Sequence, residues 1–410
     1  MSRDYKIKKS CRICGNTKFL KVLDLGKSPL ANAFLSANEL EKSEAYFPLA
    51  VYFCQKCTLV SLRHIVEPSL LFKNYHYLTS ASTPLSLHFK KLAWEVGTRY
   101  IKSKNDLVVE IGSNDGSLLS NLKNRCRVLG IDPADNVTEI AKKNGVETVT
   151  AFFSEKTAEA VVQKYGRAKV VLANNVIAHI DDLHSVFGGI KKLLSPDGVF
   201  IFEAHWVGNL ITDGGFDQVY HEHLSYFSLH AIEYIVQEFG MTIFDATLVP
   251  IHGESLRISV GNSGKASKNV RSLRQKEKIM KLDKYSTFKD FAKKVERNKN
   301  KLNTLLRKLK KQGNKIIGYG APAKGNTLLN YYKITPKILN FITDTTPLKQ
   351  GLFTPGTHIL ILSPDVLKTE KPDYILLLSW NYSIEILKKE STLRKEGVKF
   401  IIPVPDVKIV

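Results

Sequence analysis

The sequence predicts an α/β protein with an N-terminal zinc-binding module, a central Rossmann-like domain and a C-terminal Rossmann-like α/β domain. Three observations support this prediction. Four of the cysteines form two CxxC pairs in the N-terminal region. In the middle of the chain, short apolar segments alternate with helical patterns, which is typical of βαβ units. A second series of such segments, with its own glycine-containing turn, closes the chain.

The chain is expected to divide into four regions. At 410 residues it is longer than one hydrophobic core usually organises. We expect a loop-rich zinc-binding domain in residues 1–70 and a Rossmann-like domain in residues 71–264. A basic helical connector is expected in residues 265–312, followed by the second Rossmann-like domain in residues 313–410.

Apolar runs bounded by turn residues mark the strands of both Rossmann-like regions. In the central region the clearest predicted strands are Leu107–Ile111, Arg127–Ile131, Lys169–Ala173 and Val199–Glu203. In the C-terminal region they are Lys315–Gly318, Ile338–Ile342 and Tyr374–Leu378. Strands separated by helices form parallel sheets with both faces covered, and we expect such sheets here.

The positive charge of the chain is concentrated in one segment. The formal net charge is +21, and the stretch from Lys265 to Lys315 holds 19 Lys or Arg against four Asp or Glu. Apolar residues recur there at helical spacing and form one stripe on a long helix. They are Phe288, Phe291, Val295, Leu302, Leu305, Leu306 and Leu309. Aromatic residues do not alternate with the basic residues along the run, as they would in order to stack on bases. A solvated lysine-rich face is therefore favoured over an anionic partner, and no nucleic acid is expected.

Composition indicates a cytoplasmic protein without a membrane segment. Hydrophobic residues make up 43% and charged residues 24% of the chain, which is ordinary for a globular protein. No apolar run reaches the roughly 18 residues of a transmembrane helix. The N-terminus is polar and basic and lacks the apolar region of a secretory signal. Periodicity does not reveal an interface, so the oligomeric state stays open, with a monomer plausible.

Cys11, Cys14, Cys54 and Cys57 have the spacing of a zinc site. Two residues between paired cysteines let one tight turn direct both sulfur atoms at a tetrahedral ion, and four thiolates leave no open coordination position. The predicted zinc is therefore structural. The alternatives are a redox dithiol or four unrelated core cysteines, and the lone Cys126 is expected to be a core residue.

The first glycine turn follows the predicted strand at Leu107–Ile111. Five of its residues are candidates for cofactor binding: Glu110, Gly112, Asn114, Asp115 and Gly116. Glycine permits positive φ and close approach of a ligand to the backbone. A dinucleotide fingerprint would read GxGxxG and would bind a pyrophosphate, which two carboxylates repel. The acidic turn instead suits S-adenosylmethionine, which carries an ammonium and a sulfonium charge. An ordinary βα turn is the alternative.

Polar residues at the ends of two further strands complete the predicted cofactor site. Asp132 ends the next strand, about 20 residues after Gly112, where a carboxylate can accept hydrogen bonds from ribose hydroxyls. Asn174 and Asn175 follow the strand Lys169–Ala173. Because the carboxyl ends of parallel strands share one edge of the sheet, these side chains are expected to reach the same crevice.

A cluster of histidines, tyrosines and a carboxylate follows the strand Val199–Glu203. The segment FDQVYHEHLSY, residues 216–226, contains Tyr220, Glu222 and His223. The HEH spacing does not match the helical HExxH pattern of zinc ligands. The cluster offers a base that works near neutral pH and hydroxyl donors for an oxyanion. Structural core histidines are the alternative on local grounds.

The chain resembles the sugar C-methyltransferases that act on nucleotide-linked deoxysugars. The resemblance extends over nearly the whole chain and rests on an ordered series of motifs. They are CRICGN, LDLGKSPLANAF, EIGSNDGSLL, NNVIAHIDDL, FDQVYHEHLSYFS, HGESLR, GYGAPAKGNTLLN and DTTPLKQGLFTPGT. One departure is Glu254, at a position where the resemblance leads us to expect a second glycine.

The resemblance implies an S-adenosylmethionine-dependent C-methyltransferase whose substrate is a keto-deoxysugar linked to a nucleotide diphosphate, with C-3 as the implied methylated carbon. A base removes a proton next to the ketone, and the enolate attacks the methyl group. The motif match gives the role of base to His223. Supporting catalytic roles fall to Tyr220, Glu222, His179, Tyr75 and Tyr77.

The second glycine turn reads GxGxxA and begins at Gly318, with Asp344 ending the next predicted strand. Taken by itself, this turn predicts a nicotinamide-dependent oxidoreductase. The resemblance instead implies a domain that closes over the nucleotide sugar. The candidate substrate-binding residues are Arg257, Gly320, Lys324, Asn326, Lys349 and Tyr382. Arg257 either contacts substrate or pairs with a carboxylate. A zinc-containing nucleic-acid-binding protein is the third alternative.

Overall fold

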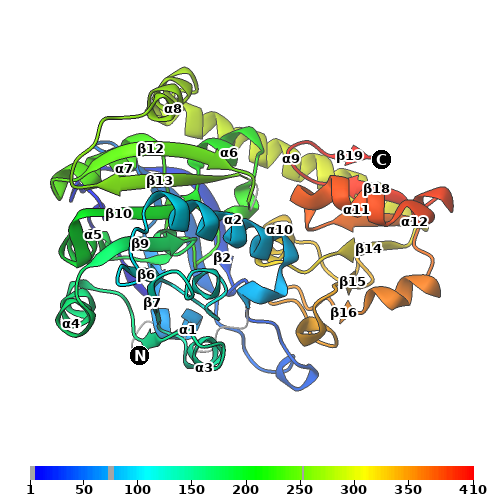
Figure 1. Ribbon diagram of the computed structural model, residues 1–410. Helices are drawn as coiled ribbons and strands as arrows, with labels where there is room; N and C mark the ends of the chain where they lie inside the picture. Colours follow the sequence, from blue (N-terminus) through cyan, green and yellow to red (C-terminus); the bar gives the residue numbers. More distant parts are fainter. Residues whose placement is uncertain (1–4, 73–77, 252–253) are drawn as a thin grey trace.

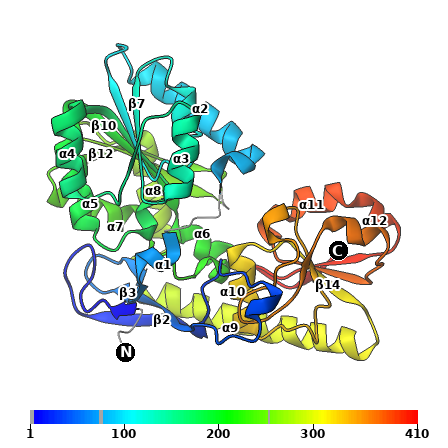
Figure 2. The ribbon, with the colours of Figure 1, turned by 90° about the horizontal axis from the view of Figure 1, so that it is seen from below.

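The computed structural model describes residues 5–72, 78–251 and 254–410 and arranges them in three lobes (Figures 1 and 2). A small N-terminal sheet, a seven-stranded central sheet and a six-stranded C-terminal sheet form the lobes. The predicted site residues Tyr75 and Tyr77 lie outside the described residues. In the described part of the chain, every helix is too short or too polar to cross a bilayer.

The N-terminal lobe is a sheet rather than the expected loop-rich region. Its strands lie in the order β11-β4-β3-β2 and pair antiparallel. They are β2 (Phe19–Ser28), β3 (Phe47–Cys54), β4 (Val60–Leu62) and β11 (Ser225–Tyr226). Strands β1 (Tyr5–Ile7) and β5 (His64–Val66) form a separate ribbon, and helix α1 spans Pro68–Phe72. The apolar run of β3 explains the difference, because six of its eight residues are buried.

The central sheet has the order β12-β13-β10-β9-β6-β7-β8. Its strands are β6 (Leu107–Ile111), β7 (Arg127–Asp132), β8 (Thr148–Thr150), β9 (Ala168–Asn174), β10 (Leu194–His205), β12 (Thr242–Val249) and β13 (Ser255–Gly261). All four predicted strands are present. We expected a parallel sheet, and this expectation was wrong for one strand: β13 lies between β10 and β12 and runs antiparallel to both.

Helices flank the central sheet (Figure 1). They are α2 (Thr83–Arg99), α3 (Asp135–Lys143), α4 (Glu155–Tyr165), α5 (Leu183–Leu193), α6 (Val207–Thr212) and α7 (Leu229–Glu238). Side chains that accept hydrogen bonds from first-turn amides start several of them, as Asp182 does for α5 and Ser228 for α7.

The C-terminal sheet has the order β16-β15-β14-β17-β18-β19, and β19 alone is antiparallel to its neighbour. The strands are β14 (Ile316–Tyr319), β15 (Ile342–Thr343), β16 (Ile361–Leu362), β17 (Tyr374–Leu377), β18 (Lys399–Ile402) and β19 (Lys408–Ile409). Helices α10 (Ala323–Tyr332), α11 (Ser383–Lys389) and α12 (Ser391–Lys395) accompany it. The predicted strand Ile338–Ile342 begins later than expected, because the amides of Ile338 and Leu339 donate to the Thr335 carbonyl in a turn.

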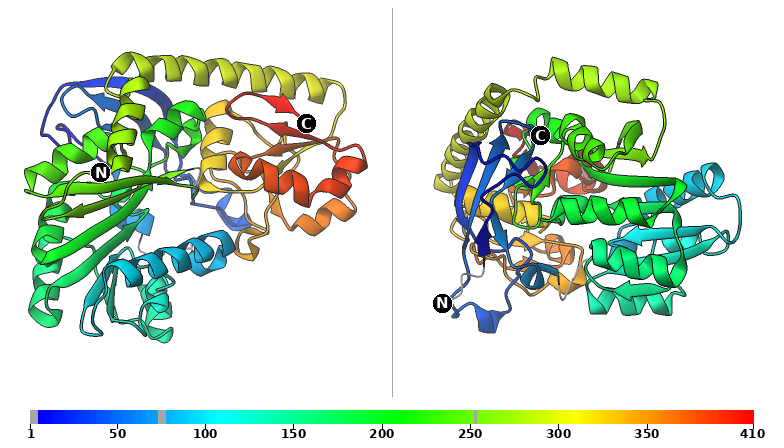
Figure 3. Two further views of the ribbon diagram at one scale, coloured as in Figure 1. Left: turned by 45° about the horizontal axis from the view of Figure 1, so that its top comes forward. Right: turned by 90° about the vertical axis from the view of Figure 1, so that its left-hand side faces the viewer.

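The basic segment contains two helices, α8 (Lys268–Ile279) and α9 (Tyr285–Lys311). The predicted apolar stripe of α9 is confirmed, since every member except the partly exposed Leu305 is buried. At one end Phe288 packs on Phe53 of the N-terminal sheet, with ring centroids 5.2 Å apart. Further along, Asn298 Nδ2 donates to the Pro403 carbonyl at 2.6 Å. Helix α9 therefore joins the N-terminal and C-terminal lobes (Figure 3).

Candidate active site

The four predicted zinc ligands lie together. The Sγ atoms of Cys11, Cys14, Cys54 and Cys57 are all within 4.8 Å of one another, and the Cys11–Cys57 and Cys14–Cys54 pairs are 3.5 Å apart. In each CxxC turn the next residue has a positive φ, 66° at Gly15 and 62° at Thr58. Zinc–sulfur bonds of about 2.3 Å in a tetrahedron need sulfur atoms at this spacing. The residues therefore fit a closed structural zinc site.

The first glycine turn connects β6 to a short 3-10 segment at Leu119–Asn121. Gly112 has a φ of 69°, and a Cβ there would lie 2.9 Å from the Val176 side chain. Its amide donates to the Ile131 carbonyl at 2.8 Å. Asn114 and Gly116 also have positive φ, at 50° and 75°. The turn is thus held tightly against the ends of β7 and β9.

The two aspartates of the predicted cofactor site have different environments. Asp115 is fully buried and accepts hydrogen bonds from the Ser80 amide at 2.9 Å and the Ser117 hydroxyl at 2.5 Å. Asp132 accepts hydrogen bonds at 3.0 Å from the amides of Asn114 and Ala134. Asp115 therefore anchors the segment before α2 to the turn, and Asp132 holds the turn from the end of β7.

Buried polar atoms without a protein partner lie beside the turn. Among the described residues, Ser113 Oγ, Glu110 Oε2, Asn174 Oδ1 and Asn175 Oδ1 have no hydrogen-bond partner. Burial raises the pKa of Glu110 well above its usual value, and Asn174 Nδ2 donates to Glu110 Oε1 at 3.4 Å. Buried polar atoms rarely stay unpaired. Their grouping at the carboxyl ends of β6 and β9 fits a polar, positively charged ligand such as S-adenosylmethionine.

His223 is held by two hydrogen bonds that fix its tautomer. Its Nδ1 lies 2.8 Å from the Gln218 carbonyl, and its Nε2 lies 2.8 Å from the Tyr220 hydroxyl. A carbonyl oxygen can only accept, so Nδ1 carries the proton. In the neutral ring Nε2 then holds the lone pair and accepts from Tyr220. His223 is 4% exposed, so this lone pair lies in a largely water-excluded place.

Two further histidine rings lie against His223: His179 stacks on it and His205 is tilted by 45°. The ring centroid of His179 lies 5.2 Å and that of His205 lies 4.7 Å from that of His223. Burial and the neighbouring His205 lower the pKa of His179 to about 3. His179 is therefore neutral near pH 7 and adds no positive charge beside the ring of His223.

Glu222 connects the histidine segment to the N-terminal lobe. Asn32 Nδ2 donates to Glu222 Oε1 at 2.7 Å, and the carboxyl group is 5% exposed. Burial raises the pKa of Glu222 to about 7, opposed by the hydrogen bond from Asn32. The structure thus pairs Glu222 with Asn32 and pairs His223 with Gln218 and Tyr220.

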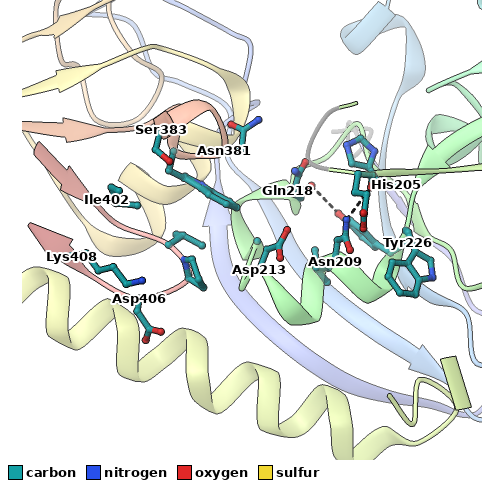
Figure 4. A pocket seen from close by; sticks show the side chains of 17 residues that line it. His205, Asn209, Asp213, Gln218, Tyr226, Asn381, Ser383, Ile402, Asp406 and Lys408 are labelled. Atoms are coloured by element: carbon teal, nitrogen blue, oxygen red, sulfur yellow. Dashed lines mark hydrogen bonds between the residues drawn. The ribbon is translucent and has the colours of Figure 1, made fainter. Parts of the chain in front are cut away.

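A cavity of about 330 Å³ lies between the central and C-terminal lobes (Figure 4). His205 and Gln218 line it from the central lobe, and Tyr226 lines it from β11 of the N-terminal sheet. Trp380 and Asn381 line it from the C-terminal lobe. Figure 4 shows the two sets facing one another. The cavity therefore reaches the residues that touch His223.

The predicted substrate residue Arg257 lies in an ion-pair network. Its Nε donates to Glu203 at 2.7 Å, and one terminal nitrogen donates to Glu95 at 2.8 Å. His88 Nε2 lies 2.8 Å from the fully buried Glu203 carboxylate. The sequence left two roles open for Arg257, contact with substrate or pairing with a carboxylate, and in the structure it pairs with carboxylates.

The second glycine turn has the same hydrogen bonds as the first. Gly320, with a φ of 82°, donates from its amide to the Thr343 carbonyl at 2.7 Å. Asp344 accepts hydrogen bonds from the amides of Ala321 at 2.6 Å and Thr346 at 2.8 Å. The Ala321 amide, which a dinucleotide would need, is therefore bound to a side chain of the protein.

The other predicted substrate residues lie near the turn but outside the cavity lining. Lys324 donates to Asn381 and lies 4.9 Å over the Trp380 ring, and burial lowers its pKa to about 8. Asn326 Nδ2 donates to the Ala31 carbonyl at 2.7 Å, and Lys349 Nζ to the Ala321 carbonyl at 2.9 Å.

Tyr382 is 39% exposed. Among the described residues that line the cavity, none belongs to the six substrate candidates, although Lys324 contacts two lining residues, Trp380 and Asn381.

Sequence reasoning missed several residues that line the cavity. His205 ends β10, a position where the rule that selected Asn174 at the end of β9 would have found it. Asp213 and Trp380 carry no such signal, because α6 and the turn Trp380–Tyr382 are irregular short elements. Asp213 and Trp380 line the same cavity only because the central and C-terminal lobes pack together.

Comparisons with known proteins agree with this architecture. A family described as "Putative zinc binding domain" matches residues 11–72, and a "Methyltransferase domain" family matches residues 89–245. A "C-methyltransferase C-terminal domain" family matches residues 250–405. C-methyltransferase NovU of Streptomyces niveus is 35% identical over 405 residues, which is 98% of this chain and 96% of the relative. This chain belongs to the C-methyltransferase family.

Solved methyltransferase structures are similar to part of this chain. Magnesium protoporphyrin IX methyltransferase of Synechocystis PCC 6803 with bound SAH is 14% identical, covers 43% of the chain and 83% of its own, and has a TM-score of 0.34. An S-adenosylmethionine-dependent methyltransferase of Clostridium acetobutylicum is also 14% identical, covers 44% and 92%, and has a TM-score of 0.36.

Family membership confirms the predicted S-adenosylmethionine-dependent C-methyltransferase with a zinc-binding module. The methyltransferase prediction is thereby favoured over the oxidoreductase and nucleic-acid-binding alternatives. The four clustered cysteines are those that the sequence predicted as zinc ligands, and all four lie within the residues matched by the zinc-binding family.

Proposed function

We propose that this C-methyltransferase methylates a carbon next to the ketone of a deoxysugar linked to a nucleotide diphosphate. The C-3 position is the one that the sequence resemblance implies. The observation that carries the proposal is the fixed tautomer of His223, which directs an unprotonated Nε2 toward Tyr220. Gln218, the partner of Nδ1, lines the cavity. Carbon becomes nucleophilic only after a proton is removed, and a base with this geometry can remove it.

The roles of the residues follow from their contacts. His223 Nε2 accepts the proton from the sugar carbon, and the bonding electrons pass into an enolate. The Gln218 carbonyl stabilises the resulting imidazolium through Nδ1–H. Once His223 Nε2 is protonated, it no longer accepts a hydrogen bond from the Tyr220 hydroxyl, and this hydroxyl donates to the enolate oxygen instead. His179 contributes a neutral ring that packs on His223 and limits water.

The residues around the first glycine turn would hold S-adenosylmethionine: Glu110, Gly112, Asn114, Asp115, Gly116, Asp132, Asn174 and Asn175. When bound, S-adenosylmethionine supplies an electrophilic methyl group on a sulfonium. Within this group Glu110, Asn174 and Asn175 offer unpaired oxygen atoms. Asp132 offers further lone pairs for hydroxyl groups.

The C-terminal lobe would bind the nucleotide sugar across the cavity. Lys324 is a buried cation beside Trp380 and Asn381, and a diphosphate is the anion it would suit. We propose that residues 71–264 bind the methyl donor, residues 313–410 close over the sugar, and residues 1–70 and 265–312 connect the two.

The proposal is tested by incubating the protein with labelled S-adenosylmethionine and a panel of nucleotide-linked keto sugars, with mass spectrometry of the products. A C-linked label on one class of sugar is expected. The His223→Ala variant should keep its affinity for S-adenosylhomocysteine in calorimetry and lose about 100-fold or more of its turnover. The exposed residue His230 gives the matched control, His230→Ala. Normal turnover in His223→Ala would overturn the assignment of the base.

A further inference from the structure

Arg12 is a buried arginine inside the first CxxC turn, between the zinc ligands Cys11 and Cys14. Only 3% of the residue is exposed. One terminal nitrogen donates to the Leu62 carbonyl at 3.0 Å and to the Leu224 carbonyl at 2.9 Å. A guanidinium at a zinc turn is thus bonded to backbone that lies 212 residues away in the chain.

The carbonyl that Arg12 binds belongs to the residue directly after His223. The amide of this residue, Leu224, donates to the Ala178 carbonyl at 2.8 Å, and Ala178 directly precedes His179. Arg12 also reaches Asp181, two residues after His179, from two nitrogens at 3.4 Å each. One buried guanidinium therefore ties together the two segments that carry the stacked histidines.

The direction of the Arg12 side chain depends on the zinc turn. The Gly15 amide donates to the Cys11 carbonyl at 3.0 Å and closes the turn, and the two flanking thiolates are fixed when they share one ion. A guanidinium presents several donors in a rigid plane, so a fixed backbone gives fixed directions for its hydrogen bonds. The zinc turn would thereby fix, through Arg12, the position of the backbone beside His223.

We propose that Arg12 is a positioning residue for methyl transfer, through which the zinc turn sets the orientation of the His223 ring. The inference rests on the proposed function of His223 as the base. Loss of Arg12 would shift the Leu224 carbonyl and with it the imidazole, so proton removal would slow. In the described part of the chain, Arg12 forms its hydrogen bonds with Leu62, Leu224 and Asp181 and none with the turn at Gly112, where the methyl donor would bind, so affinity for the donor would not change.

The protein can tolerate the substitution. In Arg12→Met the Leu224 carbonyl keeps its hydrogen bond from the Leu62 amide at 2.9 Å. Asp181 keeps two ion pairs, with Lys6 at 3.0 Å and Lys8 at 3.2 Å. No buried charge is left without a partner.

The experiment compares full-length Arg12→Met and Arg12→Lys with the wild type and with Arg63→Met as matched control. Arg63 belongs to the same lobe and donates to the Lys8 carbonyl at 2.9 Å. Two rates are measured: methyl transfer, and exchange of the acidic sugar proton with deuterated water in the presence of S-adenosylhomocysteine. Zinc content, affinity for S-adenosylhomocysteine and KM for the sugar are measured in parallel.

Both rates are expected to fall about 10-fold to 100-fold in Arg12→Met, as for partners that orient active-site groups. Arg12→Lys should recover part of the loss, because an ammonium can still donate to one carbonyl. Zinc content, affinity and KM should match those of the wild type. Arg63→Met should keep both rates.

Three results would overturn the inference: normal proton exchange in Arg12→Met, an equal loss in Arg63→Met, or a loss that parallels the loss of zinc. If the wild type itself exchanges no proton while it transfers methyl groups, the proposed function of His223 fails instead. The two failures are therefore distinguished by the same measurement.

Discussion

The indole nitrogen of Trp380 donates a hydrogen bond of 2.6 Å to the carboxylate of Asp217. Asp217 belongs to the segment that leads to His223, and Trp380 lines the cavity from the C-terminal lobe. Burial raises the pKa of Asp217 to about 6, opposed by the nearby Lys324. One hydrogen bond thus ties the segment that leads to His223 to the C-terminal wall of the cavity.

In Trp380→Phe the ring stays apolar but the donor is lost. Because a hydrogen bond to a charged group contributes about 1.5–3 kcal/mol, KM for the sugar is expected to rise about 10-fold or more, with a smaller change in kcat. Steady-state kinetics checks this. Trp94→Phe, at a residue that is 61% exposed on α2, is the control. An unchanged KM would mean that the contact does not shape the substrate site.

Removal of the Tyr220 hydroxyl should slow catalysis without weakening donor binding. In Tyr220→Phe the enolate oxygen loses its hydrogen-bond donor, and kcat is expected to fall about 100-fold. Tyr165→Phe is the control, because its hydroxyl donates to Glu147 at 2.6 Å on the protein surface. Equal rates for both variants would exclude Tyr220 as the hydrogen-bond donor to the enolate oxygen.

Glu222 should make the protein less stable as the pH rises. Burial raises its pKa to about 7 from the ordinary 4.5. The native state therefore binds the proton more tightly than the unfolded state between these values, and stability declines over this range by up to about 1.4 kcal/mol per pH unit. The thermal midpoint of wild type minus that of Glu222→Gln should fall from pH 4.5 to pH 7. The same difference for exposed Glu396→Gln should stay flat.

Asp132→Asn should weaken binding of the methyl donor. The amide keeps one acceptor oxygen for the turn but loses the charge that strengthens hydrogen bonds to ribose hydroxyls. Affinity for S-adenosylhomocysteine is expected to fall about 10-fold to 100-fold in calorimetry. The control is Asp135→Asn in the first turn of α3, an exposed residue. Wild-type affinity in Asp132→Asn would place the donor elsewhere.

Cys14→Ser should lose zinc and lower the melting temperature, because structural zinc sites contribute about 10–16 kcal/mol to the folding of small domains. Metal analysis and calorimetry measure both quantities. Cys126→Ala, at a buried cysteine of the central lobe, should keep its zinc. Full zinc content in Cys14→Ser would show that the four cysteines do not share an ion.

Features that depend on local sequence were predictable. The strands β6, β7 and β9 follow from apolar runs, the zinc cluster from CxxC spacing, and both glycine turns from their residues. The shared hydrogen-bond pattern of Asp132 and Asp344 also supports the expectation that the two α/β regions have a common plan.

Features that depend on distant residues were not predictable. Asn32 meets Glu222 across 190 residues, and Asn326 meets Ala31 across 295. Nothing local in either segment indicates its partner. Asp115 shows a second limit of prediction from sequence. The acidic turn led us to expect that its carboxylate faces the ligand, whereas its oxygen atoms accept hydrogen bonds from Ser80 and Ser117. Which groups occupy the oxygen atoms of Asp115 can be seen only in the folded structure.

The strand β11 completes the N-terminal sheet with residues that follow His223. During synthesis, β4 must keep an open edge until Ser225 and Tyr226 leave the ribosome. An open edge is a site where chains associate with one another. A fragment that ends near residue 70 would therefore be prone to aggregate. Exchange of N-terminal regions between relatives would succeed only if the strand pairing with residues 225–226 were preserved.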